Sequence, residues 1–95
     1  MNSDKVCLLV RVEGIVQGVG YRAWVARTAK GLGLKGWVRN RQDGSVEALL
    51  QGDEATVDGM LERCRTGPRM AVVSSLETSQ AEVEPLNDFS IRPTE

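Results

Sequence analysis

Three glycines in seven residues mark the segment of this sequence that is best suited to bind a ligand. Gly14, Gly18 and Gly20 fall within residues 14–20, and Arg22 follows two residues later. Glycines let the backbone curl so that successive N–H groups converge, and such a nest at the start of a helix binds phosphate. The planar guanidinium of Arg22 could hold two phosphate oxygens. A glycine-rich turn without a ligand is the alternative interpretation.

The charges around this segment favour a small anion. Residues 14–42 contain no Asp or Glu, yet they hold six of the twelve basic residues: Arg22, Arg27, Lys30, Lys35, Arg39 and Arg41. The segment lacks the Gly-Lys-Ser/Thr ending of a P-loop and the parallel context of a dinucleotide fingerprint. We therefore expect a compact phosphate group rather than a nucleotide. For Arg27 and Lys30 we expect only a solvated helix face.

Asn40 is the second residue that could do chemistry. It shares a predicted strand face with Val38, which should point toward the core. A buried amide needs hydrogen-bond partners. The alternative is that Asn40 ends the strand and simply bonds the turn that follows.

The composition excludes several other kinds of chemistry. Histidine is absent, and Cys7 and Cys64 lack metal-binding spacing, so we predict no metal site. The two cysteines could form a disulfide, although two buried thiols are the simpler prediction. A net charge of −1 argues against a general nucleic-acid partner. The apolar run at residues 6–10 is too short to cross a membrane or to be a signal peptide, so we expect a cytoplasmic protein.

The pattern of hydrophobic residues predicts one α/β (α+β) domain over residues 1–95. Alternation predicts strands at residues 6–13, 34–41, 45–51 and 71–78, with a short strand at 89–92. Helical spacing predicts helices over residues 21–32 and from a capping Asp53 to Gly67. Asp43-Gly44 predicts a hairpin turn, and residues 82–88 an exposed loop. The order βαββαβ predicts a ferredoxin-like sandwich, an antiparallel sheet with two helices on one face.

Two of these segments resemble the signatures of the acylphosphatase family. Residues 14–22, Gly-Ile-Val-Gln-Gly-Val-Gly-Tyr-Arg, resemble the first signature, and residues 36–47 resemble the second. Residues 89–92 resemble the family's final strand, so the resemblance covers nearly the whole chain. It implies the ferredoxin-like fold and hydrolysis of the carboxyl–phosphate bond of acyl phosphates. It implies no metal, no cofactor and no phosphoenzyme.

The resemblance also implies roles for individual residues. Arg22 would bind the substrate phosphate, and Asn40 would position the attacking water. The backbone amides that would complete the phosphate site belong to Gln17, Gly18, Val19, Gly20 and Tyr21. Tyr21 stands where many members have Phe, in a packing position. Similar domains also occur within larger carbamoyl-transferring proteins, but with the chain ending at Glu95 we expect no second catalytic domain here. Arg41 and Gln42 receive no role, and Glu47 is expected to be structural because it faces away from Val46.

Acyl phosphates carry a good leaving group, so their hydrolysis needs a cage and an aligned water more than a strong base. We expect the proton to go to a phosphate oxygen of the substrate. The expected partners are a small acyl phosphate and inorganic phosphate as product, with no membrane partner, and the protein is expected to be a monomer. The alternative is a non-catalytic module, either an RNA platform or a small-molecule sensor. An RNA platform needs exposed aromatics on its middle strands, where Trp37 is the single candidate.

Overall fold

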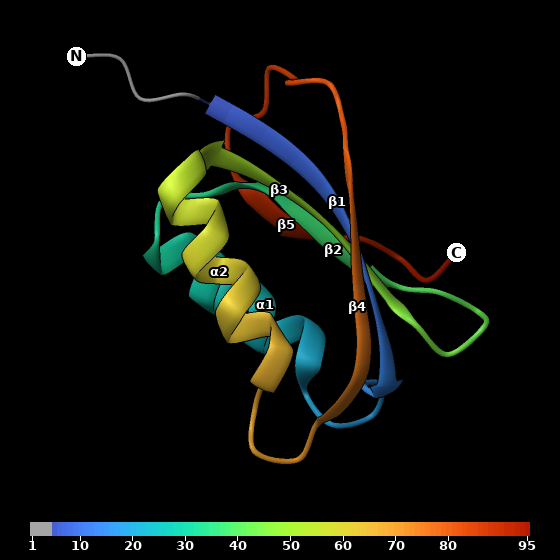
Figure 1. The fold of residues 1–95 in the computed structure, drawn as a ribbon. Helices are drawn as coiled ribbons and strands as arrows, with labels where there is room; N and C mark the ends of the chain where they lie inside the picture. The colour runs from blue at the N-terminus through green and yellow to red at the C-terminus, as the bar shows by residue number, and fades with distance from the viewer. Residues whose placement is uncertain (1–4) are drawn as a thin grey trace.

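One five-stranded sheet with two helices on the same face makes up the structure, a computed structural model that describes residues 5–95 (Figure 1). The strands are β1 (Lys5–Ile15), β2 (Lys35–Asn40), β3 (Val46–Asp53), β4 (Val72–Gln80) and β5 (Phe89–Ile91). The helices are α1 (Tyr21–Gly31) and α2 (Glu54–Thr66). This confirms the predicted ferredoxin-like arrangement, with element ends shifted by at most two residues.

The strand order is β4-β1-β3-β2-β5, and the pairs among the first four strands are antiparallel as predicted. The prediction of an all-antiparallel sheet is wrong for β5, which pairs in parallel with β2. The reason lies in the connections. β4 ends beside the start of β1, where Gln80 pairs with Leu8. Because β2 also begins at that end of the sheet, a chain that crosses there and re-enters beside β2 must run in the same direction.

The period of two along β1 places its side chains in two separate clusters. Val10 and Val12 are buried under the helices, with Val6 and Leu8 packed against the same core. Cys7 and Leu9 point to the opposite face. The second helix places Val57, Met60 and Cys64 in the main core, as its spacing predicted. Cys7 and Cys64 are both free and buried, on opposite sides of the sheet.

Residues 81–88 form a loop that packs against the sheet, whereas the sequence predicted an exposed loop at residues 82–88. Ala81 and Leu86 pack on a second small cluster of Cys7, Trp37 and Leu49, on the sheet face without helices. Gln51, a buried polar residue of β3, holds this loop against the sheet by two hydrogen bonds. Its Nε2 donates to the Glu84 carbonyl at 2.7 Å, and its Oε1 accepts from the Glu84 amide at 2.8 Å. The loop therefore covers part of the sheet face that carries no helices.

Replacing Gln51 by Ala should loosen this cover. Each hydrogen bond contributes about 0.5–1.5 kcal/mol net, so we expect Gln51→Ala to lower the free energy of unfolding by about 1–3 kcal/mol. Urea denaturation would measure the change, with the exposed Gln80→Ala as the control. A Gln51→Ala variant as stable as the parent would show that the loop is held by its apolar contacts alone.

The helix ends only partly follow their sequence signals. Asp53 occupies the N-cap position of α2 as predicted, but its side chain makes no capping hydrogen bond. Gly67 ends that helix with a φ of 67°, a conformation that glycine adopts without strain. No helix within residues 5–95 has the length and apolar content needed to cross a membrane.

Candidate active site

The topology brings the glycine-rich loop and Asn40 to the same end of the sheet. β1 and β2 are each antiparallel to β3, so they run in the same direction and end at the same edge. The loop at residues 16–20 follows β1, and Asn40 is the last residue of β2. Asn40 pairs with Val46, whose side chain is buried in the main core. Asn40 therefore lies on the helix side of the sheet, as its alternation predicted.

The loop backbone is curled by glycines, as the sequence suggested. Gly18 and Gly20 have φ values of 76° and 81°, and a Cβ at either position would meet no atom within 4 Å. Glycine is therefore needed there for its backbone freedom rather than for space. Gly20 is the N-cap of α1, which has no capping side chain and no acidic residue in its first turn. Within residues 5–95 the amides of residues 17–22 donate no hydrogen bond to the protein, so these donors are available to a ligand.

The side chain of Gln17 makes a contact that the sequence did not predict. Its Nε2 donates to the carbonyls of Arg41 and Ser45, at 2.8 Å each. These two carbonyls belong to the turn between β2 and β3, directly after Asn40. Gln17 thus ties the loop to the strand that carries Asn40. The sequence could not indicate this contact because the acceptors are backbone atoms 24 and 28 residues away.

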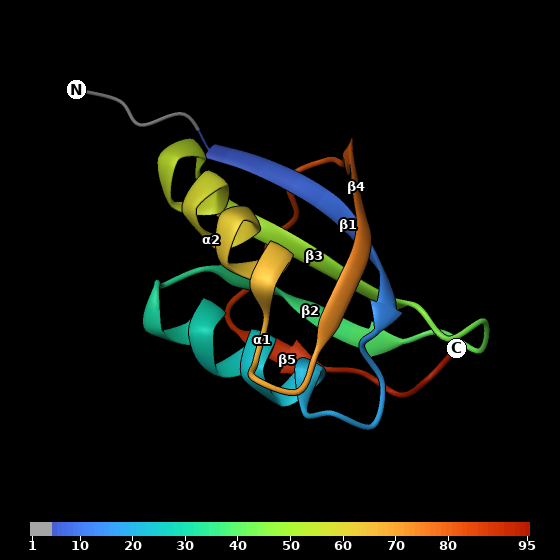
Figure 2. The same ribbon diagram turned by 60° about the horizontal axis from the view of Figure 1, so that its bottom comes forward.

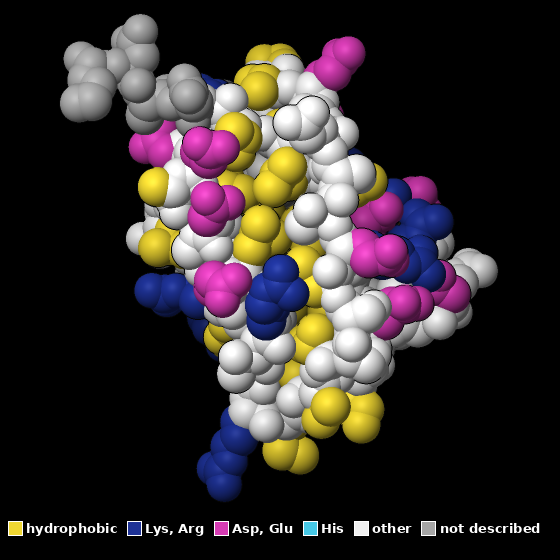
Figure 3. All heavy atoms as spheres, in the orientation of Figure 1, with side chains coloured by type: hydrophobic (Ala, Val, Ile, Leu, Met, Phe, Trp, Pro, Cys, Tyr) yellow, Lys and Arg dark blue, Asp and Glu magenta, His cyan; other side chains and the backbone are white. Residues whose placement is uncertain are grey.

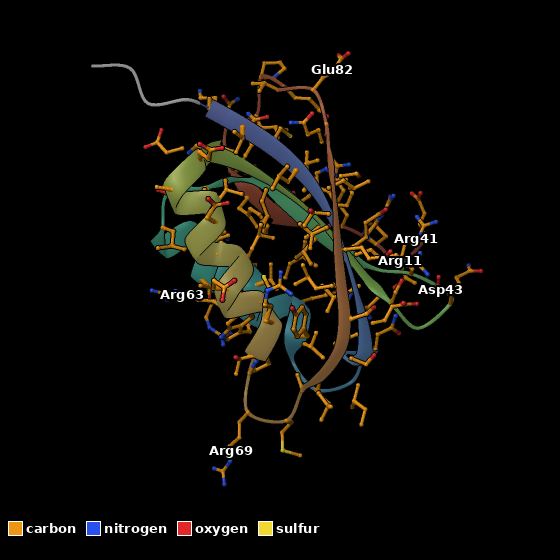
Figure 4. All side chains as sticks on the ribbon, viewed as in Figure 1. Arg11, Arg41, Asp43, Arg63, Arg69 and Glu82 are labelled. Atoms are coloured by element: carbon orange, nitrogen blue, oxygen red, sulfur yellow. The ribbon has the colours of Figure 1, made fainter. Side chains whose placement is uncertain are left out.

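Asp43 organises the turn that Gln17 grips. Its Oδ1 accepts from the Ser45 hydroxyl at 2.6 Å and from the Ser45 amide at 2.9 Å, and its other oxygen accepts from Arg11. Figure 4 shows Arg11, Arg41 and Asp43 gathered at this turn. The Ser45 hydroxyl, the Ser45 amide and then Arg11 lower the pKa of Asp43 to about 2.

This lowered pKa makes a prediction about acid stability. The ionised Asp43 stabilises the folded protein above the ordinary pKa of 3.8, and this contribution is lost as the pH falls through about 2. We therefore expect Asp43→Ala to be less stable than the parent at pH 6, with the difference shrinking toward pH 2. Thermal melts at both pH values would measure this, with Asp58→Ala on α2 as a control. A difference that does not depend on pH would contradict the assignment.

Asn40 has the one buried side-chain oxygen or nitrogen within residues 5–95 that lacks a hydrogen-bond partner, its Oδ1. The alternative prediction, that Asn40 bonds the following turn, is not what the structure shows, because Asp43 holds that turn. The backbone of Asn40 is firmly placed: it pairs with Val46, and its carbonyl accepts from the Glu95 amide at 3.1 Å. A fixed amide with an unused oxygen is suited to hold a water molecule.

Arg22 lies in the first turn of α1, half-buried. Among the residues that the structure describes, no acid is paired with it. Arg39 and Arg41 differ, because each is paired with an acid: Glu47 lies 2.7 and 3.5 Å from them, and Glu95 lies 2.9 Å from Arg39. These ion pairs are consistent with the structural role predicted for Glu47. They also leave fewer unpaired cations in residues 14–42 than the sequence suggested. Arg27 and Lys30 are exposed, as expected.

Tyr21 and Val19 fix the two sides of the loop to the core. Tyr21 is fully buried, and its hydroxyl donates to the Cys64 carbonyl at 2.7 Å. Burial also raises the pKa of Tyr21, so its side chain stays a neutral packing group. Val19 packs against the same core. Both residues can therefore offer backbone amides to a ligand, while their side chains anchor the loop.

Two hollows on the surface lie away from the loop and from Asn40. Two surface hollows of about 340 and 320 Å³ are both lined by Lys5, at the opposite end of the sheet. Neither includes the loop or Asn40. A phosphate group is small enough to be held by converging amides and one guanidinium without such a cavity.

Comparison with known proteins identifies clear relatives. The family model described as Acylphosphatase matches residues 8–91. The acylphosphatase of Rhodospirillum rubrum is 54% identical over 87 residues, which span 92% of this chain and 96% of that protein. The structure of an acylphosphatase from Coxiella burnetii matches with a TM-score of 0.90 at 36% identity, over 94% of each chain. That of the Bacillus subtilis acylphosphatase matches with a TM-score of 0.89 at 34% identity, over 92% of this chain and 98% of that one.

Proposed function

The chain belongs to the acylphosphatase family of hydrolases, and we propose that it hydrolyses acyl phosphates by direct attack of water on phosphorus. The products are a carboxylate and inorganic phosphate. The observation that carries the site assignment is the buried, unpartnered Oδ1 of Asn40 at the loop end of the sheet. An unsatisfied buried acceptor costs about 1–3 kcal/mol, and a bound water would offset this cost.

The phosphoryl group is held by the loop and by Arg22. The free amides of Gln17, Gly18, Val19, Gly20 and Tyr21 form the cradle, and the start of α1 adds the positive end of its dipole. Arg22 supplies a full positive charge and two parallel donors for the equatorial oxygens. These donors are in place before the substrate arrives, so they stabilise the developing charge without reorganising.

The water is aligned by Asn40. Its Oδ1 accepts one hydrogen of the water, and its Nδ2 can donate to the water or to a phosphate oxygen. The water oxygen forms the new bond to phosphorus while the bond to the carboxylate oxygen breaks. The electron pair leaves with the carboxylate, and the water's proton passes to a phosphate oxygen. A weakly basic leaving group makes a strong general base unnecessary.

The partners we propose are small molecules, with no nucleic acid and no membrane involved. An RNA platform is not favoured because Trp37 is only 8% exposed. The guanidinium groups of Arg39 and Arg92 each lie over the ring, 4.7 Å from its centroid, where a base would have to stack. A monomer in the cytoplasm, where Cys7 and Cys64 stay reduced, completes the proposal.

Hydrolysis of benzoyl phosphate by the purified protein tests this function directly. We expect activity that survives exhaustive treatment with a chelator, because the roles above need no metal. Within residues 5–95, no three potential metal-binding side chains are clustered, and metal independence remains a prediction. Activity lost in chelator and restored by Mg²⁺ or Zn²⁺ would refute the mechanism. An inactive but folded protein would refute the function.

A further inference from the structure

Three exposed hydrophobic side chains lie together at the loop end of the molecule. Ile15 and Val72 are each 57% exposed, and Met70 is 69% exposed. Ile15 and Val72 are direct cross-strand partners, so their side chains share one face. Figure 3 shows hydrophobic side chains gathered on the surface at this lower end. We call Ile15, Met70 and Val72 the apolar patch, and a grouping of this kind calls for a ligand or partner.

The patch runs along one side of the phosphate cradle. Gly67 begins the turn between α2 and β4, so close to the end of the loop that an added Cβ would lie 2.6 Å from Cε2 of Tyr21. Val72 ends that turn beside Ile15, where the loop begins. The turn therefore follows the loop from one end to the other, and Figure 2 shows the two side by side.

The opposite side of the cradle belongs to Asn40. Gln17 bonds the loop to the β2–β3 turn on that side. The strand order confirms the separation, because β4 and β2 lie on opposite sides of β1. The loop thus has the proposed water site on one flank and the apolar patch on the other.

Phosphoryl transfer places the attacking and leaving oxygens in line, on opposite sides of phosphorus. With the water held by Asn40, the leaving carboxylate points toward the flank that carries the patch. We propose that Ile15, Met70 and Val72 form the subsite for the acyl chain, and that the protein favours aromatic or other large apolar acyl groups. This inference rests on the function proposed above. Arg69 in the same turn points away from the body of the protein, so it leaves the patch uncharged (Figure 4).

A variant that changes polarity but little else tests the subsite. In Ile15→Thr/Met70→Gln/Val72→Thr, the strand residues stay β-branched and the turn residue keeps its length. We expect kcat/KM for benzoyl phosphate to fall about fivefold to tenfold, because the ring loses apolar contact area. The value for acetyl phosphate and inhibition by inorganic phosphate should stay unchanged. Val83→Thr/Ile91→Thr is the matched control, since those side chains are 51% and 50% exposed and lie outside the patch.

The outcomes separate the subsite from the function itself. A parent protein that hydrolyses neither substrate would refute the proposed function. A parent that hydrolyses both, with a folded patch variant that loses neither or loses both equally, would refute the subsite alone. Should the triple variant fail to fold, Met70→Gln in the exposed turn must still lower the benzoyl phosphate value selectively. A parent dimer that the patch variant dissociates, with benzoyl phosphate activity intact, would make the patch an interface and overturn the proposal.

Discussion

An Asn40→Ala variant will bind inorganic phosphate nearly as well as the parent, while its turnover of benzoyl phosphate falls about 10²–10³-fold. The reason is the division of labour in the site. In the proposed mechanism the cradle amides and Arg22 hold the phosphate, whereas Asn40 acts on the water. Because its Oδ1 has no partner among residues 5–95, truncation removes no hydrogen bond to those residues through that atom. We therefore expect the melting temperature to stay close to that of the parent.

Three measurements on one Asn40→Ala sample decide between a role in catalysis and a role in structure. They are the melting temperature, the phosphate inhibition constant and the turnover number. Asn87→Ala, the same change at an exposed position of the 81–88 loop, is the matched control. A folded Asn40→Ala variant with near-normal turnover would mean that the water is held elsewhere. A large loss of stability with turnover intact in the folded fraction would make Asn40 a structural residue.

The second large effect concerns Arg22. Replacing it by Ala should weaken phosphate binding at least about tenfold, because each charge-assisted hydrogen bond contributes about 1.5–3 kcal/mol. No described acid is paired with Arg22, so its charge is available to the ligand. Competition by inorganic phosphate in the benzoyl phosphate assay measures the effect in variants that retain activity, and calorimetry measures it in those that do not.

Arg27→Ala provides a control with the same change of net charge on the same helix. Arg27 is exposed, so its loss should leave phosphate affinity nearly unchanged. Arg22→Lys should also be impaired, because an ammonium group cannot form two parallel bonds to phosphate. If Arg22→Ala and Arg27→Ala weaken phosphate binding equally, Arg22 contributes only through its net charge and not through specific hydrogen bonds. If a folded Arg22→Ala protein binds phosphate with unchanged affinity, Arg22 does not belong to the phosphate site.

Much of the fold could be predicted because local patterns determine it. The alternation in β1 separates Val10 and Val12 from Cys7, and these residues do lie on opposite faces. The direction of β5 could not be predicted, since three residues carry no signal that distinguishes parallel from antiparallel pairing. Its direction follows from where β4 ends and where residues 81–88 cross. That crossing depends in turn on Gln51, whose partner is a backbone group 33 residues away.

Some features of the candidate site could likewise be predicted from the sequence, and others could not. Glycine positions and the charge of Arg22 are visible in the sequence because they reflect local backbone requirements and composition. The bonds from Gln17 to the β2–β3 turn, and the missing partner of Asn40, depend on atoms that only the tertiary structure brings together. Family resemblance supplied the roles of Arg22 and Asn40, and the variants above are what test them.

The parallel pairing of β5 with β2 also affects when the site can be completed. β2 and β3 are neighbours along the chain, whereas Gly36 pairs with Phe89 and the Asn40 carbonyl bonds the Glu95 amide. Contacts between residues so far apart in sequence tend to form late, because closing a long loop costs entropy before the contacts repay it. During synthesis the segment that forms the phosphate cradle leaves the ribosome early. The strand that carries Asn40 gains its second neighbour only when the last residues emerge, so hydrolytic activity should appear at the end of folding.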